Sequence, residues 1–297
     1  MNEVIGYIFN EPYLRKDELI FQKVAKKKKI KLLMINTSKD LGENSLQEKI
    51  EQCDIFLNNS AEQFSLEIAK TIDALGGKVI DDPRNFYFEE DKWLFFVQCE
   101  KNKIPVPKTI LLSENLSVAK KELKEMDCWP LVIKRIEGSC GEYVEKAENV
   151  NEAEKIIIRF WENGKEKLPI IAQELIRSPS YRVTLIDGKV VQTVIKKNNG
   201  WKSTGVYEKN FKKFKVDKKL KKILKKIHEI SKIKICGIDL LKKGDEWVVL
   251  EINSQPGLDF FENEREKLIG KILDFLKKEI KKSHKKPQEV FPKISMR

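Results

Sequence analysis

The chain has 297 residues, of which 41% are hydrophobic and 35% are charged, and its formal net charge is +12. This length can bury one or two hydrophobic cores. No apolar run approaches the roughly 18 residues that span a bilayer, and the first residues lack the basic and apolar segments of an export signal. We therefore expect a cytoplasmic protein without a membrane segment.

The cysteines and histidines argue against several kinds of site. The five cysteines are scattered, and none stands in a Cys-x-x-Cys pair. An odd, dispersed set is typical of reduced thiols and does not favour a disulfide framework or a zinc site. The only histidines are His228 and His284. Catalysis by a serine–histidine or cysteine–histidine pair is therefore not expected.

The strong positive charge bears on the choice of partner. A basic protein attracts polyanions such as nucleic acids, nucleotides and acidic proteins. Lysines dominate the charge, in the run at 26–29 and again at 218–226. Lysine-rich helices are usually solvated, and aromatic residues are not interleaved with these runs as base stacking would require. We therefore do not favour nucleic-acid binding, which stays open as an alternative.

The first 80 residues are predicted to alternate between strands and helices. We expect strands at 4–9, 30–35, 54–57 and 78–80, and helices at 16–28, 45–53 and 61–75. Strands separated by helices indicate a small parallel α/β domain. No Gly-x-Gly-x-x-Gly segment follows the first strand, so a dinucleotide fingerprint is missing there.

A domain boundary is predicted near Asp81-Asp82-Pro83-Arg84, and the elements change order after it. Helices are expected at 89–101, 117–126, 151–163, 218–232 and 263–282. Strands are expected after the proline-stiffened segment 103–107 and at 130–134, 169–176, 181–186 and 189–196, the last two joined at Asp187-Gly188. We predict domains at 1–82 and 83–283 and a polar tail at 284–297.

The most informative segment is a predicted hairpin near the C-terminal end. Cys236-Gly-Ile-Asp239-Leu-Leu and Trp247-Val-Val-Leu-Glu251-Ile-Asn253 read as strands joined by the polar turn at 242–246. Strand side chains alternate between faces, so Glu251 and Asn253 point to one side, and Asp239 can join them there. Two carboxylates and an amide oxygen suit Mg²⁺. The alternative is a hairpin whose acidic residues face solvent.

Two upstream segments have features of a nucleotide site. Lys134 ends an apolar strand directly before the loop that contains Gly138, Ser139 and Gly141. A lysine beside backbone donors can hold a phosphate, although an ordinary turn would look the same. Gln173-Glu174-Leu175 follows another apolar strand and could read an adenine edge and a ribose, or could simply end a strand at the surface.

Three further cations are candidate contacts. Lys92 lies at the start of a predicted helix, where it could bind a phosphate or a base. Arg182 and Lys196 lie on the two strands of the predicted hairpin around Gly188 and could project to one face. There they could sit as cations above a phosphate or carboxylate. Taken alone, each of the three is better explained as a solvated surface charge than as a ligand contact.

The order and spacing of these residues resemble the ATP-grasp superfamily, and within it the RimK-like carboxylate–amine ligases. The resemblance covers roughly 81–280, and the strongest match is Cys236-Gly-Ile-Asp-Leu-Leu with Leu250-Glu-Ile-Asn-Ser-Gln-Pro-Gly-Leu258. It implies a mixed α/β (α+β) fold in which two α+β lobes, at about 105–175 and 176–283, hold ATP between them. A small parallel pre-ATP-grasp α/β domain at 1–82 would precede them.

The resemblance also implies residue roles. Asp239, Glu251 and Asn253 would hold two Mg²⁺ ions, for which Mn²⁺ is an alternative, and Arg182 and Lys196 would act in catalysis. ATP would be bound by residues spread over both lobes, namely Lys92, Lys134, Gly138, Ser139, Gly141, Gln173, Glu174, Leu175, Ile176, Lys196 and Lys202.

The chain departs from the family pattern at three places. Glu142-Tyr143 follow Gly141, where the family usually has another glycine and a small apolar residue. Ser180 stands where an aspartate near the ribose is usual. Lys202-Ser-Thr-Gly205 replaces a segment that begins with arginine, and a lysine keeps that charge without the bidentate geometry. The acceptor side of the site is therefore expected to differ from that of the best-known members.

The expected reaction joins a carboxylate and an amine with ATP. The carboxylate would attack the γ-phosphate to give an acyl phosphate, and an amine such as that of glutamate would then form an amide, releasing ADP and phosphate. The net charge of +12 indicates an acidic protein or peptide tail as acceptor. The family resemblance implies a homo-oligomer. The alternatives are a nucleotide-binding module without turnover and an ATP-grasp enzyme of another branch, such as a D-alanine–D-alanine-type ligase.

Overall fold

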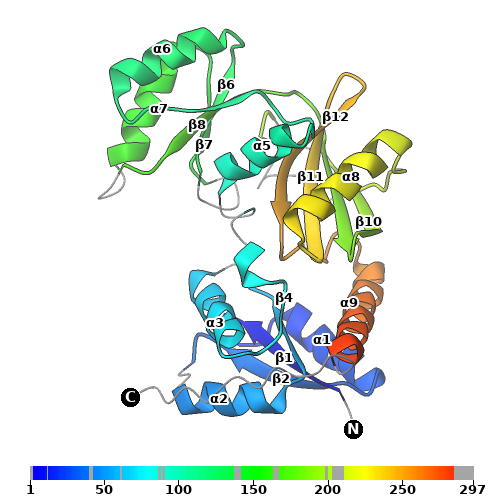
Figure 1. Ribbon diagram of the computed structural model, residues 1–297. Helices are drawn as coiled ribbons and strands as arrows, with labels where there is room; N and C mark the ends of the chain where they lie inside the picture. The colour runs from blue at the N-terminus through cyan, green and yellow to red at the C-terminus, as the bar shows by residue number, and fades with distance from the viewer. Residues whose placement is uncertain are drawn as a thin grey trace. The chain divides into compact units, whose positions relative to one another are not determined.

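The structure is a computed structural model of the whole chain (Figure 1). It describes residues 3–11, 13–39, 43–60, 62–85, 88, 91–136, 142–162, 167–197, 200–202 and 211–283. The chain forms two compact units. The first contains Met1–Asn85, Ile233–Cys236 and Ser254–Arg297, and the second contains Phe86–Lys232 and Gly237–Asn253.

The first unit contains a parallel sheet in the order β2-β1-β3-β4. Its strands are β1 (Val4–Phe9), β2 (Lys31–Asn36), β3 (Ile55–Asn58) and β4 (Val79–Ile80). The helices between them are α1 (Lys16–Lys27), α2 (Glu43–Gln52) and α3 (Gln63–Ala74), followed by the short η1 (Pro83–Asn85). The predicted alternation of strands and helices in the first 80 residues is therefore confirmed.

Helix α9 (Glu262–Ser283) packs against α1 in the same unit. Charged pairs join the two helices, among them Lys23 with Glu266 and Arg265 with Asp17. The sequence assigned this helix to the region at 83–283, and that domain boundary stays a prediction. Among the described residues, no helix is long and apolar enough to cross a membrane.

The second unit contains two antiparallel sheets. The first has the order β5-β8-β6-β7, and its strands are β5 (Thr109–Leu111), β6 (Leu131–Arg135), β7 (Val144–Ala147) and β8 (Ile170–Glu174). Helices α6 (Leu116–Met126) and α7 (Val150–Glu162) cover one face of it (Figure 1). Helix α5 (Lys92–Lys101) belongs to the same unit, and the Asp91 side chain caps it by accepting from the Leu94 amide.

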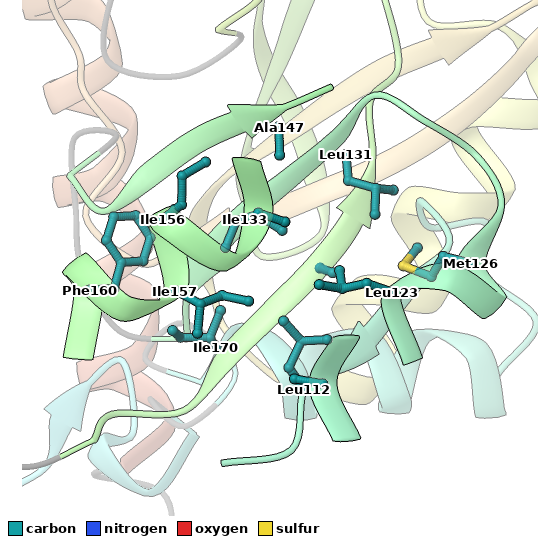
Figure 2. Close-up of a cluster of buried hydrophobic side chains, with 13 residues drawn as sticks. Leu112, Leu123, Met126, Leu131, Ile133, Ala147, Ile156, Ile157, Phe160 and Ile170 are labelled. Carbon is teal, nitrogen blue, oxygen red and sulfur yellow. The ribbon is translucent and has the colours of Figure 1, made fainter. Parts of the chain in front are cut away.

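The alternation of side chains along these strands divides the sheet into two faces. Leu131, Ile133, Ile170 and Ala172 point into a core that α6 and α7 complete with Leu123 and Phe160, among others (Figure 2). The residues between them, which include Val132 and Lys134, point to the opposite face, because the side-chain period of a strand is two. That opposite face lines part of the site described below.

The second sheet has the order β10-β9-β11-β12. Its strands are β9 (Ser180–Ile186), β10 (Lys189–Lys196), β11 (Ile235–Lys243) and β12 (Glu246–Asn253). Helix α8 (Lys218–Ser231) is amphipathic, with a buried stripe of Leu220, Leu224 and Ile227. Its capping residue Asp217 is tied to this sheet by a 2.7 Å hydrogen bond from Trp247 Nε1.

Candidate active site

A buried ionic cluster lies on the sheet β10-β9-β11-β12. Arg182 donates to the Asp239 carboxylate from Nε at 2.8 Å and from Nη2 at 2.6 Å. Lys196 Nζ donates to the same carboxylate at 3.0 Å. Arg182 of β9 lies directly opposite Val194 of β10, so their side chains share one face of the sheet. Lys196 follows Val194 by two residues on the same strand and therefore shares that face too. The structure thus brings the two predicted catalytic cations into contact with a predicted metal ligand.

The charges of this cluster explain its protonation. Burial of Asp239, whose side chain is 1% exposed, favours the neutral acid. Arg182 and Lys196 outweigh that effect and hold the pKa of Asp239 well below its usual range. Burial lowers the pKa of Lys196, against the opposing pull of Asp239. The cluster is therefore expected to hold Asp239 as a carboxylate at neutral pH.

Glu251 lies directly opposite Asp239 on the paired strands β11 and β12. Burial and the nearby Asp239 carboxylate both raise the pKa of Glu251. Two carboxyl groups this close do not both ionise readily unless a cation joins them. The pair is therefore a place where an additional positive charge would be stabilised.

A β-bulge in β12 lies next to this pair. The register runs from Asp239↔Glu251 to Leu240↔Val249, which leaves Leu250 as the extra residue. Leu250 clusters with Leu241, which shares the face of Asp239. The bulge thereby changes the phase of the strand, so that apolar Leu250 and ionisable Glu251 serve the same face of the sheet.

Asn253 completes the polar end of β12. It pairs with Gly237 across the strands, two residues beyond Glu251. Its Nδ2 is buried and makes no hydrogen bond to a described residue. Two carboxyl groups and the oxygen of this amide are ligands that suit a magnesium site, since Mg²⁺ takes a few carboxylates and fills its octahedron with other oxygens. The described residues contain no group of three or more His, Cys, Asp or Glu side chains placed to hold a metal, so phosphate or water oxygens would have to contribute.

On the other sheet, Lys134 is buried beside a neutral amide. Its Nζ donates to Gln173 Oε1 at 2.6 Å, and Gln173 Nε2 donates to Thr109 Oγ1 at 2.8 Å. The three residues come from β6, β8 and β5. Burial lowers the pKa of Lys134 to about 8, with Glu251 opposing and Lys92 reinforcing that shift. Among the residues that the structure describes, no carboxylate is in direct contact with the Lys134 ammonium.

Lys92 and Glu174 each contact other parts of the protein, and their predicted roles toward ATP stay predictions. Lys92 Nζ donates to the Ile136 carbonyl at 3.2 Å, directly before the segment at 137–141. The Glu174 carboxylate accepts from the Lys108 amide at 2.9 Å and from Lys243 Nζ at 2.6 Å. Glu174 therefore ties the end of β8 to the end of β11, and its side chain is already engaged.

One pocket joins residues of both sheets. Its lining includes several predicted nucleotide contacts, namely Lys134, Gln173, Glu174, Leu175, Ile176 and Lys202. The remainder is mostly apolar and comprises Val132, Val144, Trp201, Leu241 and Leu250. Its lining combines apolar side chains with lysines, which is the chemistry that a base and its phosphates require.

Three residues of the predicted ATP site cannot be compared with the structure, and the structure adds other residues to the site. Gly138, Ser139 and Gly141 lie outside the described residues. Thr109 and the second group of lining residues, from Val132 to Leu250, were not identified from the sequence. Val132 had a usable signal, because it precedes Lys134 by two on the same strand and must share its face. Leu250 had none, because the alternation rule alone puts it on the face away from Glu251.

The region from residue 89 to residue 276 matches the family model of the RimK-like ATP-grasp domain. This match covers more than half of the chain. The chain belongs to the RimK-like ATP-grasp family. It is accordingly an ATP-dependent ligase that joins a carboxylate to an amine, and the sequence-based identification of its family is confirmed.

Several curated relatives of this RimK-like protein are similar over much of their length. The coenzyme gamma-F420-2:alpha-L-glutamate ligase of Methanocaldococcus jannaschii is 28% identical over 202 residues, which is 67% of this chain and 69% of that protein. The probable alpha-L-glutamate ligase of Psychromonas ingrahamii is 29% identical over 231 residues, or 74% of each chain.

Solved structures share the fold. The RimK domain ATP-grasp protein from Sphaerobacter thermophilus aligns with a TM-score of 0.72 at 16% identity, over 92% of this chain and 98% of that one. D-alanine–D-alanine ligase from Bacillus anthracis, complexed with ATP, aligns with a TM-score of 0.71 at 17% identity. The alignment covers 95% of this chain and 99% of that one. The predicted ATP-grasp fold is confirmed, and binding of ATP with Mg²⁺ is general for that fold.

Proposed function

We propose that this RimK-like ligase adds an amino acid, with glutamate as the first candidate, to a carboxylate-bearing acceptor. The names of the relatives support glutamate, since both are alpha-L-glutamate ligases. The observation that carries the proposal is a single continuous face. It runs from the ionic cluster of Arg182, Lys196 and Asp239 through Glu251 to the apolar pocket at Leu250.

We place the base of ATP in the apolar pocket, against Leu250 and Ile176, with the backbone of Glu174 and Leu175 at its edge. Lys134, one of the two lysines that line this pocket, then lies at the phosphate end, because it is the one whose pKa responds to Glu251 of the ionic face. Lys92 and the segment at 137–141 would add phosphate contacts. An ATP phosphate would meet in Lys134 a positive charge that Gln173 orients but does not neutralise.

We assign Asp239, Glu251 and Asn253 as the ligands of two Mg²⁺ ions, which Mn²⁺ could replace. When bound, the ions would neutralise negative charge on the phosphates and on the attacking carboxylate. Three protein ligands cannot fill two octahedral shells, so phosphate and water oxygens would complete both. Asp239 would then exchange its contacts with Arg182 and Lys196 for the ions.

The exchange suggests what the two cations do. An acceptor carboxylate oxygen attacks the γ-phosphorus, the bond to the β,γ-bridging oxygen breaks, and ADP leaves. The amine nitrogen then attacks the acyl carbon, loses a proton, and expels phosphate to leave an amide. Arg182 and Lys196, released from Asp239, would stabilise the negative charge that develops on the transferred phosphoryl and acyl oxygens.

We also propose an acidic acceptor, such as a peptide tail, because the chain carries a net charge of +12.

We place the reaction in the cytoplasm, in keeping with the free cysteines Cys53, Cys99, Cys128 and Cys236. Light scattering of the purified protein tests the expected homo-oligomer, which a monomeric mass would contradict.

A phosphate-release screen tests the reaction. The protein is incubated with Mg-ATP, each of the amino acids in turn, and peptides with or without acidic tails. We expect release that needs both an amine and an acidic acceptor, with a product heavier by one amino-acid residue. Binding of ATP without release under any pairing would instead support a nucleotide-binding module, and release with D-alanine alone would support the other ligase branch.

A further inference from the structure

Gln173 differs from the other polar residues of the pocket because both ends of its amide are engaged. Its oxygen accepts from Lys134 Nζ, and its nitrogen donates to Thr109 Oγ1. The side chain is 2% exposed. Among the described residues, Gln173 is the one side chain that hydrogen-bonds to Lys134. The geometry of Lys134 therefore depends on the direction in which this amide points.

Thr109 fixes that direction. The Thr109 hydroxyl donates to the Pro107 carbonyl at 2.8 Å, and a hydroxyl has one proton to give. Toward Gln173 its oxygen can therefore act only as an acceptor. The amide must then present its NH₂ group to Thr109 and its oxygen to Lys134, whose ammonium can only donate. The chain of three bonds permits one orientation of the amide.

The strand register explains why these residues meet. Gln173 of β8 lies between Thr109 of β5 and Val132 of β6. Lys134 is two residues beyond Val132, and so it is the diagonal neighbour of Gln173 on the same face. All of the contacts thus run across a regular antiparallel sheet, which holds them more rigidly than a loop would.

We propose that Gln173, oriented by Thr109, is a positioning residue that holds Lys134 toward the phosphates of ATP. The inference rests on the proposed function, in which Lys134 contacts a phosphate. A carboxylate at position 173 would hold the ammonium equally well but would cancel its charge and repel the incoming phosphates. An amide fixes the position and leaves the charge available.

Three variants separate this role from simple packing. Q173L removes the acceptor, Q173E replaces it with a charge, and T109V removes the group that orients the amide. T184V is the matched control, because Thr184 is a buried threonine of the other sheet whose hydroxyl makes no hydrogen bond to a described residue. Melting temperatures establish that each variant folds, and T109V, the smallest change, keeps the test valid if Q173L does not.

The measurement is the dissociation constant of Mg-ATP by calorimetry between pH 6.5 and 9.5. We expect Q173L to weaken binding about tenfold or more, the usual scale for a hydrogen bond to a charged group, and T109V to weaken it a few-fold. The pH above which the affinity for ATP declines should be lower in Q173L than in the wild type, and higher in Q173E. At neutral pH, Q173E should also bind ATP more weakly than the wild type. The charged neighbours Lys92 and Glu251 are unchanged in all variants.

The K134M variant keeps the two hypotheses apart. If K134M weakens ATP binding while Q173L and T109V bind as the wild type does at every pH, the positioning role is wrong and the proposed function stands. If K134M binds ATP with wild-type affinity, Lys134 does not contact a phosphate, and that placement within the proposed function falls together with the inference. A shift of the pH midpoint in Q173L and Q173E but not in T184V supports the role.

Discussion

The two antiparallel sheets of the second unit both bury cations on the faces we assign to the site, but they give them different partners. In the sheet β5-β8-β6-β7, Lys134 meets the neutral amide of Gln173. In the sheet β10-β9-β11-β12, Arg182 and Lys196 meet the carboxylate of Asp239. The first arrangement keeps a positive charge unneutralised at a cost in solvation, and the second neutralises most of its charge internally.

This difference indicates two modes of action. A cation held by an amide is ready to meet an anion, because no ionic bond has to break first. Cations held by a carboxylate become available only when something else binds that carboxylate. On this view Lys134 receives the nucleotide as the protein stands, whereas Arg182 and Lys196 act after metal ions have taken Asp239.

The largest expected effect breaks the carboxylate side of the comparison. Glu251→Gln removes one charge from the proposed metal site, and we expect ADP production to fall about a thousandfold or more, since such ions supply several kcal/mol of transition-state stabilisation. ATP binding should weaken yet stay measurable. Coupled assay of ADP at saturating ATP measures the rate. Glu246→Gln, an exposed change on the same strand, is the control, and near-normal turnover by Glu251→Gln would rule out the metal assignment.

The next effect concerns stability. Asp239→Asn leaves Arg182 and Lys196 buried without their carboxylate, and breaking a buried ionic group in this way typically costs about 3–5 kcal/mol. Urea unfolding of the metal-free protein measures it, with the exposed Asp245→Asn as control. Adding Arg182→Met should restore part of the loss. A loss below about 1 kcal/mol would mean that Asp239 does not neutralise these cations in solution.

Lys134→Met gives the contrasting result on the other sheet. We expect ATP affinity to fall about 10- to 100-fold, because a charge-assisted phosphate contact is lost. The free energy of unfolding should not fall by the several kcal/mol expected of Asp239→Asn, because burial already disfavours the charged lysine. Calorimetry and urea unfolding measure the two quantities, and Lys124→Met, an exposed change on α6, is the control. A stability loss as large as that of Asp239→Asn would remove the distinction between the two sheets.

The smallest effect is a pH dependence of stability. The pKa of Lys134 is about 8 in the folded protein and about 10.4 in an unfolded chain, so between these values the unfolded state binds more protons. The contribution of Lys134 to the free energy of unfolding is therefore unfavourable below pH 8 and should rise by about 2 kcal/mol between pH 7 and 9.5. The difference between the wild type and Lys134→Met, from urea unfolding at several pH values, isolates this residue. A difference that stays constant with pH would contradict the lowered pKa.

The sequence predicts the positions of these residues better than their contacts. Strand alternation places Glu251 and Asn253 on one side, and a hairpin register brings Asp239 to them. Alternation says nothing about which cation pairs with which carboxylate, because that depends on how β9 lies beside β11. The bond between Gln173 and Thr109 joins residues 64 positions apart, and no local pattern marks it.

The bulge at Leu250 also limits how this enzyme can be altered. Leu250 is the extra residue of the bulge, so its deletion would keep the pairing of Glu251 with Asp239 and of the residues on either side. The pocket would lose one apolar side chain, but the polar face would keep its order. Deleting Ile252, which lies in regular pairing, would instead turn Asn253 to the opposite face of the sheet. In protein engineering, β12 can therefore be shortened at position 250 without a change of register, but not between Glu251 and Asn253.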